Sequence, residues 1–530
     1  MASVVIGVDV GTSGTKSGIY DDTGRLVSAA FEESNLIYLK PAWVEQRPDE
    51  IERSVHNTIR EAIDRGGVRP ADVAAIAIDG QMGGVSTIDA NWEPVTRYDS
   101  WLDTRCAPFL ETLKAHSSEI LASSGGMPSY NHGPKILYWK NEFPEAWGRI
   151  RAFIQPAAYV AGRLAGLRGD DAFIDPTYLS YSAFADTANR RWNEDLLSHY
   201  HLDVAKFPRI VDPWHVIGRV TSGAAAATGL LEGTPIAAGC GDGAANVLGG
   251  GLVEPNMTYD LAGTSACLSV VTDRFVTDQA SGTMITSPHV IPGLYTIGAY
   301  VAGGGLNLRW FRDVICGPES KRWEEFGLNP YNEIDRMAAN APLGADRLFF
   351  LPHFAGRSTP NDPSMRGGFF GLTWRHTKDH MARSILESIA YEYALYREAI
   401  GRFAPFIEFS RIIGFGGGAK SALFRQMKSD ILNLPYACLE RDEFGTLGSA
   451  MIAGKSVGLF DDLAATARKF SADQRDETLP IPDNGRQYVE LSRFYKDLIA
   501  ASSVLFDKLS AFETRSVSTT AQSEYLLPVN

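Results

Sequence analysis

The stretch that decides the fold is Ile6-Gly-Val-Asp-Val-Gly-Thr-Ser13, close to the start of the chain. An apolar run beginning at Val4 leads into Asp9, and small residues with hydroxyl groups follow at once. Such a run is typical of a buried strand that ends in a tight turn. We therefore predict a strand over residues 4–9 and a turn over residues 11–14.

Strands and helices alternate after this opening. The turn Asp21-Asp-Thr-Gly24 predicts a hairpin between strands at 15–20 and 26–31. Apolar residues that recur every four positions predict a helix that starts near Asp49. The β-branched run at 73–79 predicts a further buried strand. This mixture indicates an α/β fold.

The opening motif has an echo in the second half of the chain. Residues 258–265 read Thr-Tyr-Asp-Leu-Ala-Gly-Thr-Ser, so an apolar strand pattern with an aspartate again precedes Gly-Thr-Ser. Two copies of a strand, turn and strand unit predict two similar domains that face each other. The stretch at about 105–220, richer in aromatic residues and short helical segments, is predicted to be an insertion that carries surface and substrate contacts.

Composition limits the class of protein. The chain has 530 residues, of which 45% are hydrophobic and 21% charged, so it can build extended cores and does not match disordered, collagen-like or coiled-coil proteins. The formal net charge is −13 and no block of five like charges occurs, which disfavours a nucleic-acid partner. The sequence contains no run of 18 apolar residues, so no membrane-spanning segment is predicted. Five scattered cysteines without a CxxC pair favour a reducing cytoplasm over a disulfide framework or zinc site.

Three glycine-rich turns offer places for phosphate groups. In residues 9–16, small residues after a strand let backbone N–H groups converge on an anion, Lys16 adds positive charge, and Asp9 suits a hydrated Mg²⁺. Residues 263–265 repeat this pattern, and residues 416–421 join an apolar strand to a helical stretch. Each turn alone also fits a hairpin or close helix packing without a ligand. Three of them in one chain favour nucleotide binding.

Asp242 is the candidate for acid–base chemistry. It stands in Gly239-Cys-Gly-Asp-Gly243, where the glycines leave room for a substrate hydroxyl to approach the carboxylate. Phosphoryl transfer needs such a proton acceptor and little other covalent help from the protein. An aspartate in a glycine-rich turn or at a helix N-cap has the same local pattern, so both interpretations remain open on spacing alone.

A sugar-binding wall is suggested by two short segments. Gln81 follows the strand that ends at Asp79, and Trp101, Asp103 and Arg105 come shortly after. An amide, an indole, a carboxylate and a guanidinium match the hydroxyl edges and the apolar face of a sugar. The alternative is a surface ion pair between Asp103 and Arg105 beside a core tryptophan.

Taken together, these motifs resemble the FGGY family of carbohydrate kinases over roughly residues 4–500. The sharpest match is Gly367-Gly-Phe-Phe-Gly-Leu, seven residues, and then His-Met-Ala-Arg-Ser-Ile-Leu-Glu387. Residues 42–46, 80–82 and 101–105 resemble the xylulokinase branch most closely.

The resemblance implies the ASKHA (actin/hexokinase/Hsp70-like) fold, with two ribonuclease-H-like domains and a catalytic cleft between them. The N-terminal domain at 1–252 would hold the sugar and the C-terminal domain at 253–500 the nucleotide. A helix end and a polar tail would follow at 501–530. The implied protein is a cytoplasmic enzyme that uses ATP and Mg²⁺ and takes a small sugar as its partner. A homodimer is left open.

The resemblance also assigns roles by position. Asp242 would be the general base, and Asp9 would help to hold Mg²⁺–ATP, so that both become candidate metal ligands. The expected nucleotide and phosphate contacts are Gly11, Thr12, Ser13, Lys16, Gly263, Thr264, Gly305, Arg309, Gly417, Gly418 and Ser421. The expected sugar contacts are Gln81, Met82, Trp101, Asp103 and Asp242.

Two departures from the family pattern bear on the substrate. Xylulokinases typically carry histidine after Gln-Met, where this chain has Gly83, and Arg357 stands where glutamate is common. We expect the change at Arg357 to affect domain contacts more than chemistry. The predicted reaction is ATP-dependent phosphorylation of a primary hydroxyl of a ketopentose such as D-xylulose. The alternatives are a kinase for ribulose, erythritol or gluconate, and a non-catalytic nucleotide-binding sugar sensor on the same fold.

Overall fold

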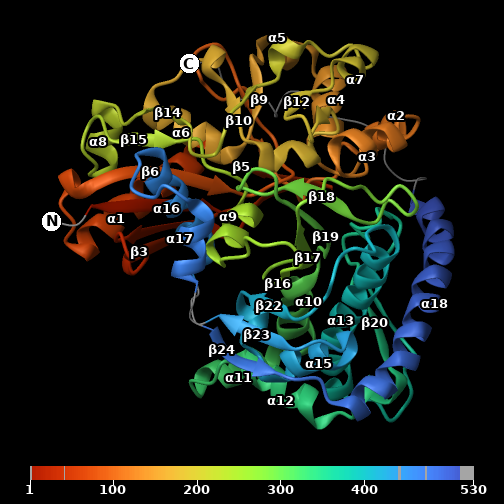
Figure 1. Cartoon of the computed structure of the whole chain (residues 1–530). Coiled ribbons are helices and arrows are strands. Elements are labelled where there is room, and N and C mark those ends of the chain that lie inside the picture. Colours follow the sequence, from red (N-terminus) through yellow and green to blue (C-terminus); the bar gives the residue numbers. More distant parts are fainter. Residues whose placement is uncertain (1–2, 41, 440–442, 472–473, 514–530) are drawn as a thin grey trace.

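The computed structural model describes residues 3–40, 42–439, 443–471 and 474–513. Within these residues the chain builds two large sheets, of six and seven strands, with helices packed on their faces (Figure 1). The predicted polar tail falls largely on residues 514–530, which lie outside the described residues.

The first sheet contains the opening motif. Its strands, in order across the sheet, are β14 (Val216–Arg219), β15 (Pro235–Ala237), β6 (Val73–Gly80), β1 (Val4–Val10), β2 (Gly14–Tyr20) and β3 (Leu26–Glu33). β1 runs antiparallel to β2 and parallel to β6. Central strands covered on both faces read as continuous apolar runs, as β1 and β6 do. The predicted strands at 4–9, 15–20, 26–31 and 73–79 are confirmed.

The second sheet repeats this topology. In order, its strands are β24 (Gln474–Thr478), β23 (Tyr436–Leu439), β22 (Ile412–Phe415), β16 (Thr258–Ala262), β17 (Ala266–Thr272), β19 (Tyr295–Val301) and β18 (Ile285–Pro288). β16 pairs antiparallel with β17 and parallel with β22, as β1 does with β2 and β6. The two Gly-Thr-Ser turns therefore occupy matching places, and the duplication predicted from the echo is confirmed.

The helix predicted near Asp49 is α1 (Pro48–Gly66). Its apolar stripe, Ile51, Val55 and Ile59 among it, is buried against the first sheet because a four-residue period keeps these side chains on one face.

Part of the C-terminal half packs back onto the first sheet. In α16 (Phe444–Ser456), Leu447 and Met451 join a core with residues of β1 and β6 (Figure 1). The helix backbone lies so close to β1 that a Cβ on Gly7 would stand 1.8 Å from the carbonyl oxygen of Thr446. By its position in the sequence, α16 falls within the C-terminal domain expected at 253–500. In the structure it packs on the first sheet, whose strands come from the N-terminal half.

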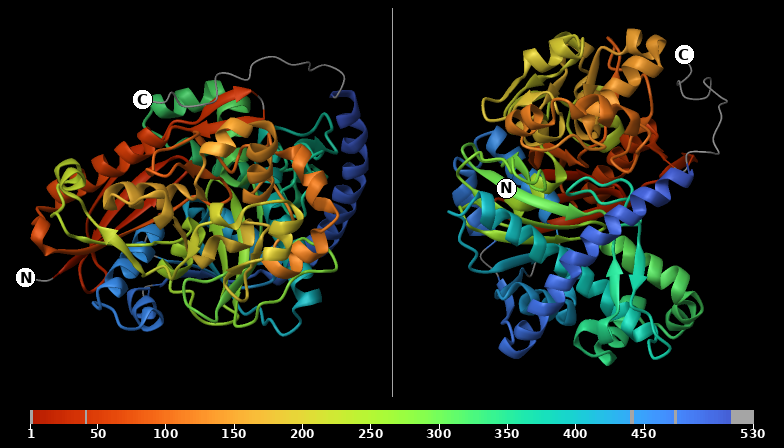
Figure 2. Two further views of the ribbon diagram at one scale, coloured as in Figure 1. Left: turned by 90° about the horizontal axis from the view of Figure 1, so that it is seen from above. Right: turned by 90° about the vertical axis from the view of Figure 1, so that its right-hand side faces the viewer.

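The remaining helices surround these sheets. The helices that follow β6 in the sequence, before the first strand of the second sheet, are α2 (Ala107–Lys114), α3 (Ser117–Ser124), α4 (His132–Glu142), α5 (Pro144–Arg149), α6 (Pro156–Ala165), α7 (Glu194–His199), α8 (Ser222–Thr228) and α9 (Asp242–Gly249). The C-terminal half adds α10 (Gly304–Trp310), α11 (Gly317–Glu325), α12 (Pro330–Asn340), α13 (Lys378–Phe403), α14 (Gly417–Lys420), α15 (Ala422–Leu432), α17 (Leu463–Phe470) and α18 (Pro482–Glu513). The long helix α18 runs along the outside of the molecule (Figure 2). In the described part of the chain, no helix combines the length and apolarity that crossing a membrane requires.

Candidate active site

A line of charged side chains crosses the first sheet where β1 and β6 end. Asp9 on β1 is in register with Asp79 on the parallel strand β6 and with Lys16 on the antiparallel strand β2. Beyond β6, Gly80 forms a bridge with Gly241, the residue before Asp242. The carboxyl ends of parallel strands meet at one edge, so the pairing brings three carboxyl groups from distant sequence positions to one place.

Burial and mutual repulsion raise the pKa values of these carboxyl groups. The pKa of Asp242 is raised to about 7, first by burial and then by the negative charge of Asp9. The pKa of Asp9 is raised to about 6 by burial, against the lowering effect of Lys16. Asp79 is fully buried, and burial together with Asp9 raises its pKa well above the ordinary value. Carboxyl groups that repel one another in a site of low polarity are typical of functional centres.

The edge of the first sheet where Asp9, Asp79 and Asp242 meet has carboxyl groups that could bind a cation. Within the described residues, Oδ1 of Asp9 is buried and has no hydrogen-bond partner, so it could become a ligand without giving up a bond. The same residues contain no cluster of three or more His, Cys, Asp or Glu side chains arranged to hold a metal. Mg²⁺ usually takes one or two protein carboxylates and fills its other positions with water and substrate phosphates, which matches Asp9 and Asp242.

The glycines around Asp242 let its segment pack closely against β6 and against the Met82 side chain. A Cβ on Gly239 would stand 1.8 Å from the carbonyl oxygen of Ile78, and one on Gly241 would stand 2.6 Å from Sδ of Met82. Asp242 itself is the first residue of α9, and the N-cap is Gly241. Its carboxylate is thus not used as the N-cap, and it keeps some exposure to solvent.

A chain of hydrogen bonds joins the predicted sugar side to the predicted phosphate side. Nε1 of Trp101 donates to Oγ1 of Thr12 at 2.8 Å, and that hydroxyl donates to Oε1 of Gln81 at 3.2 Å. Nε2 of Gln81 in turn donates to Oε1 of Gln46 at 2.7 Å. The first Gly-Thr-Ser turn and the Gln81–Met82 loop are therefore held as one unit.

Asp103 lies outside this chain of hydrogen bonds. Its side chain is fully buried, and Oδ2 accepts hydrogen bonds from the Val44 amide at 2.7 Å and from Nε of Arg105 at 2.8 Å. Arg105 also pairs with Glu45, and Nζ of Lys135 donates to the carbonyl oxygen of Asp103. Asp103 thus belongs to a buried charge cluster, which supports neither the expected sugar contact nor the alternative of a surface ion pair.

The residues expected around the nucleotide mostly converge at the second sheet. The Gly305 amide donates to the Gly263 carbonyl at 3.0 Å. The turn after β22 comes equally close, because a Cβ on Gly418 would stand 2.9 Å from that of Ala262. Ser421 instead caps α15 by accepting from the Phe424 amide at 3.1 Å.

Lys16 and Arg309 complete the set of expected nucleotide contacts. Nζ of Lys16 forms an ion pair of 3.0 Å with Glu443, at the N-terminal end of α16, so its charge is already balanced. Arg309 lies on α10 with its side chain exposed.

A cavity of about 100 Å³ lies beside Asp242, between the two sheets. Met82, Tyr181 and Gly243 line it from the first half of the chain, and Tyr259 and Tyr300 line it from the second.

The short helix η3 (Pro176–Tyr181) lies in the region of predicted short helices, and it holds Tyr178, whose role was not predicted from the sequence. The Tyr178 hydroxyl bonds the carbonyl oxygens of Gly80 and Cys240, both at 3.0 Å, and so clamps the segment before Asp242 to the end of β6. No local pattern marks such a residue, because its partners are far away in sequence.

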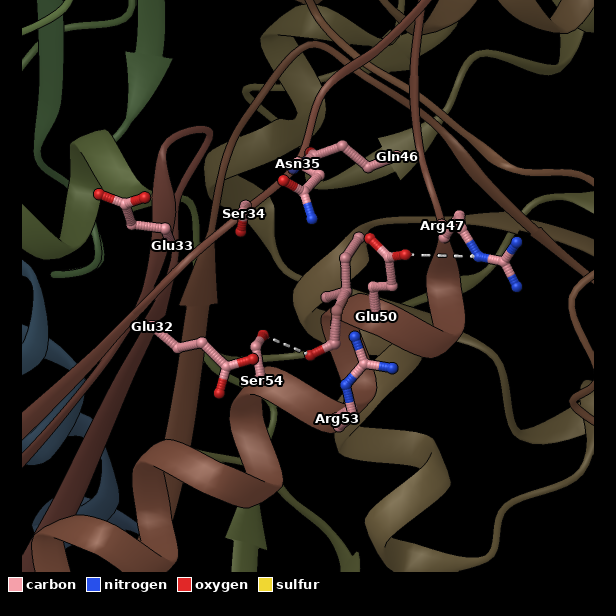
Figure 3. A pocket seen from close by; sticks show the side chains of 10 residues that line it. Glu32, Glu33, Ser34, Asn35, Gln46, Arg47, Glu50, Arg53 and Ser54 are labelled. Carbon is pink, nitrogen blue, oxygen red and sulfur yellow. Dashed lines mark hydrogen bonds and ion pairs between the residues drawn. The ribbon is translucent and has the colours of Figure 1, made fainter.

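A smaller hollow of about 50 Å³ lies between β3 and α1 (Figure 3). Glu32, Glu50, Arg47 and Arg53 surround it, and Arg47 reaches Glu50 at 3.6 Å. Among the described residues that line this hollow there is neither Asp242 nor a member of the two Gly-Thr-Ser turns, so it is separate from the cavity beside Asp242. Its wall includes Gln46, the last member of the hydrogen-bonded chain from Trp101.

Comparison with known proteins matches both halves of the chain to one family. The sequence models for the N-terminal and C-terminal domains of the FGGY family of carbohydrate kinases match residues 4–249 and 259–457. A xylulose kinase of Staphylococcus epidermidis is 28% identical over 474 residues, covering 88% of this chain and 90% of the relative. A gluconokinase of Bacillus subtilis is 26% identical over 507 residues, covering 94% and 96%.

The fold agrees with that match. The crystal structure of a gluconate kinase from Lactobacillus acidophilus superimposes with a TM-score of 0.84 at 24% identity, covering 96% of this chain and 100% of the other. The two sheets of matching topology are thus those of the ASKHA fold. The chain belongs to the FGGY family of carbohydrate kinases, enzymes that transfer a phosphoryl group to a sugar.

Proposed function

We propose that this protein transfers the γ-phosphoryl group of ATP to a primary hydroxyl of a ketopentose, with D-xylulose as the leading candidate. The observation that carries the proposal is Asp242, a carboxylate whose pKa is raised by burial and by Asp9, and whose neighbour Gly243 lines a cavity between the two halves of the chain. The xylulose kinases among the relatives support the choice of sugar.

Asp242 acts as the general base in this proposal. Its carboxylate takes the proton of the substrate hydroxyl while that oxygen forms a bond to the γ-phosphorus, and the bond from that phosphorus to the β-phosphate oxygen breaks to release ADP. With a pKa of about 7, the group is substantially ionised at neutral pH and basic enough to accept the proton.

The two glycine-rich turns hold the phosphates. In this proposal the amides of Thr12 and Ser13 donate from the first sheet, and the amide of Thr264 donates from the second. Gly11 and Gly263 shape the two turns, because their own amides donate to the carbonyl oxygens of Gly14 and Ser265. Asp9 and Asp242 would hold Mg²⁺, which would supply positive charge to neutralise the phosphates. The remaining nucleotide contacts proposed are Lys16, Gly305, Arg309, Gly417, Gly418 and Ser421.

The sugar contacts proposed are Gln81, Met82 and Trp101, with Asp242 at the reacting hydroxyl. Gluconate is the second candidate substrate, because one relative is a gluconokinase. Intact Asp9 and Asp242 argue against a non-catalytic sensor. A cytoplasmic location and a homodimer remain predictions.

The test is ADP release with Mg²⁺ and ATP against D-xylulose, L-xylulose, D-ribulose, L-ribulose, erythritol, glycerol and gluconate. We expect a ketopentose to give the highest kcat/KM. Asp242→Ala should lose turnover by orders of magnitude and still bind ATP. Retained turnover in that variant would refute the role of Asp242, and release with none of the sugars would refute the proposed activity.

A further inference from the structure

Asn131 crowds the place where a side chain of residue 83 would begin. Gly83 has φ 83°, and a Cβ built on it would stand 3.0 Å from Oδ1 of Asn131 and 3.2 Å from Cβ of Trp101. The amide of Asn131 therefore lies close to where a side chain at position 83 would stand, beside the Gln81–Met82 loop.

The side-chain amide of Asn131 is not held by a hydrogen bond to any other group in the described residues. Asn131 precedes α4, yet its side chain makes no capping bond to that helix. No hydrogen bond of this side chain is found in the described part of the chain, and the residue is 9% exposed. An amide in this state can donate to one ligand hydroxyl and accept from another.

His132 presents a second uncommitted group. The residue is 3% exposed, and within the described residues its Nε2 is buried without a partner. The ring lies 6.3 Å from that of Tyr181, which lines the cavity together with Met82 and Gly243. Leaving a buried polar atom unpaired costs stability, so its retention needs a reason such as a bond to a ligand.

The charges around this region favour a neutral ligand. Burial and Lys135 lower the pKa of His132 to about 3, so the imidazole is neutral and offers one donor and one acceptor, as a hydroxyl does. Lys16 and Lys135 are already paired with Glu443 and Asp103. A carboxylate-bearing sugar would meet the acidic edge of the sheet without an uncommitted partner among these cations.

We propose that Asn131 and His132 supply, from the start of α4, the hydrogen-bonding wall that position 83 lacks, and that this wall selects a neutral polyol over a sugar acid. The inference deepens the proposed function and rests on it for the reaction, but it can be tested by binding alone.

The test is calorimetric titration of the full-length protein, without nucleotide, with D-xylulose, D-ribulose, erythritol and gluconate. The variants are Asn131→Ala and His132→Phe, which keeps the ring and removes its nitrogens. Asn193→Ala is the matched control, because Asn193 also precedes a helix, α7, but caps it through its side chain.

We expect wild-type protein to bind a neutral polyol more tightly than gluconate. Each α4 variant should weaken that binding by about tenfold or more, with MgATP affinity unchanged. His132→Phe should also raise the Tm of the ligand-free protein, because it removes an unpaired buried nitrogen. Asn193→Ala should lower the Tm and leave polyol affinity unchanged.

Three results would overturn the inference: gluconate binding more tightly than every neutral polyol, unchanged polyol affinity in both α4 variants, or no polyol binding by wild-type protein. If polyol binds and the variants weaken it, the inference stands even where no ADP is released with that polyol. In that case only the proposed activity fails.

Discussion

The hydroxyl of Ser449 donates a hydrogen bond of 2.6 Å to Oδ2 of Asp79. Ser449 lies on α16, which returns from the C-terminal half, and Asp79 lies at the end of β6. The bond lowers the pKa of a carboxyl group that burial and Asp9 raise. A helix remote in sequence thus helps to set the protonation of the acidic edge.

Ser449→Ala should lower the free energy of unfolding by about 1–3 kcal/mol, because it leaves a buried carboxylate oxygen unpaired. The folded-state pKa of Asp79 is raised, so its contribution to stability is present below its unfolded pKa and lost as pH rises toward the folded value. Without Ser449 this loss grows, so the difference in stability between the variant and the wild type should increase as pH rises. Urea unfolding over a range of pH values measures it. Ser456→Ala on the same helix, whose hydroxyl bonds within the helix, is the control. Equal losses in both variants would contradict the role of Ser449.

The kcat/KM for the sugar should fall as pH drops below about 7. Asp242 must be ionised to accept a proton, and its pKa is raised to about 7 by burial and by Asp9. Asp9, with a pKa of about 6, titrates in the same range, so the acidic limb reports the pair and can be steeper than a single ionisation. Rates measured from about pH 5.5 to 8.5 at saturating ATP would show it. A flat profile over this range would rule out Asp242 as the base.

Asp103→Asn should affect stability and leave sugar recognition intact. The substitution removes the charge that faces Arg105 in a buried cluster, and we expect a loss of about 1–3 kcal/mol with an unchanged KM for the sugar. Asp186→Asn, in an exposed pair with Arg191, should cost about 0.5 kcal/mol or less and serves as the control. A large rise in KM at unchanged Tm would show instead that Asp103 contacts the sugar, as the sequence suggested.

Arg357→Glu should destabilise the C-terminal half, although it introduces the residue that the family commonly carries. Arg357 pairs with Glu392 at 3.0 Å. Burial raises the pKa of Glu392, but Arg357 and His353 outweigh it and lower that pKa to about 2. Since Tyr495 of α18 bonds the same carboxylate, the contact lies within the C-terminal half and is not the domain contact that we expected.

A second carboxylate beside Glu392 should cost about 3–5 kcal/mol, as breaking a buried ion pair does. Thermal unfolding measures the loss, and the double variant Arg357→Glu/Glu392→Gln should recover part of it. No recovery would mean that Arg357 acts through packing and not through its charge.

Much of the fold could be predicted from local sequence patterns. Four of the six strands of the first sheet, together with α1 and the two Gly-Thr-Ser turns, follow from apolar periodicity and turn chemistry, which act over a few residues. The strands β14 and β15 were not predicted. The echo between residues 6–13 and 258–265 suggested duplicated domains, and the paired topology of the two sheets confirms them.

The sequence by itself thus determined these local elements and the family, and it suggested the duplication. Only the tertiary structure decided which side chains meet. Strand register places Asp79 beside Asp9, Asp103 belongs to a buried charge cluster, and Asn131 lies close to Gly83. Contacts of this kind depend on packing between segments that lie far apart in the chain. Local patterns carry no record of such packing, so the same Asp-x-Arg spacing could equally have faced a sugar or an ion pair.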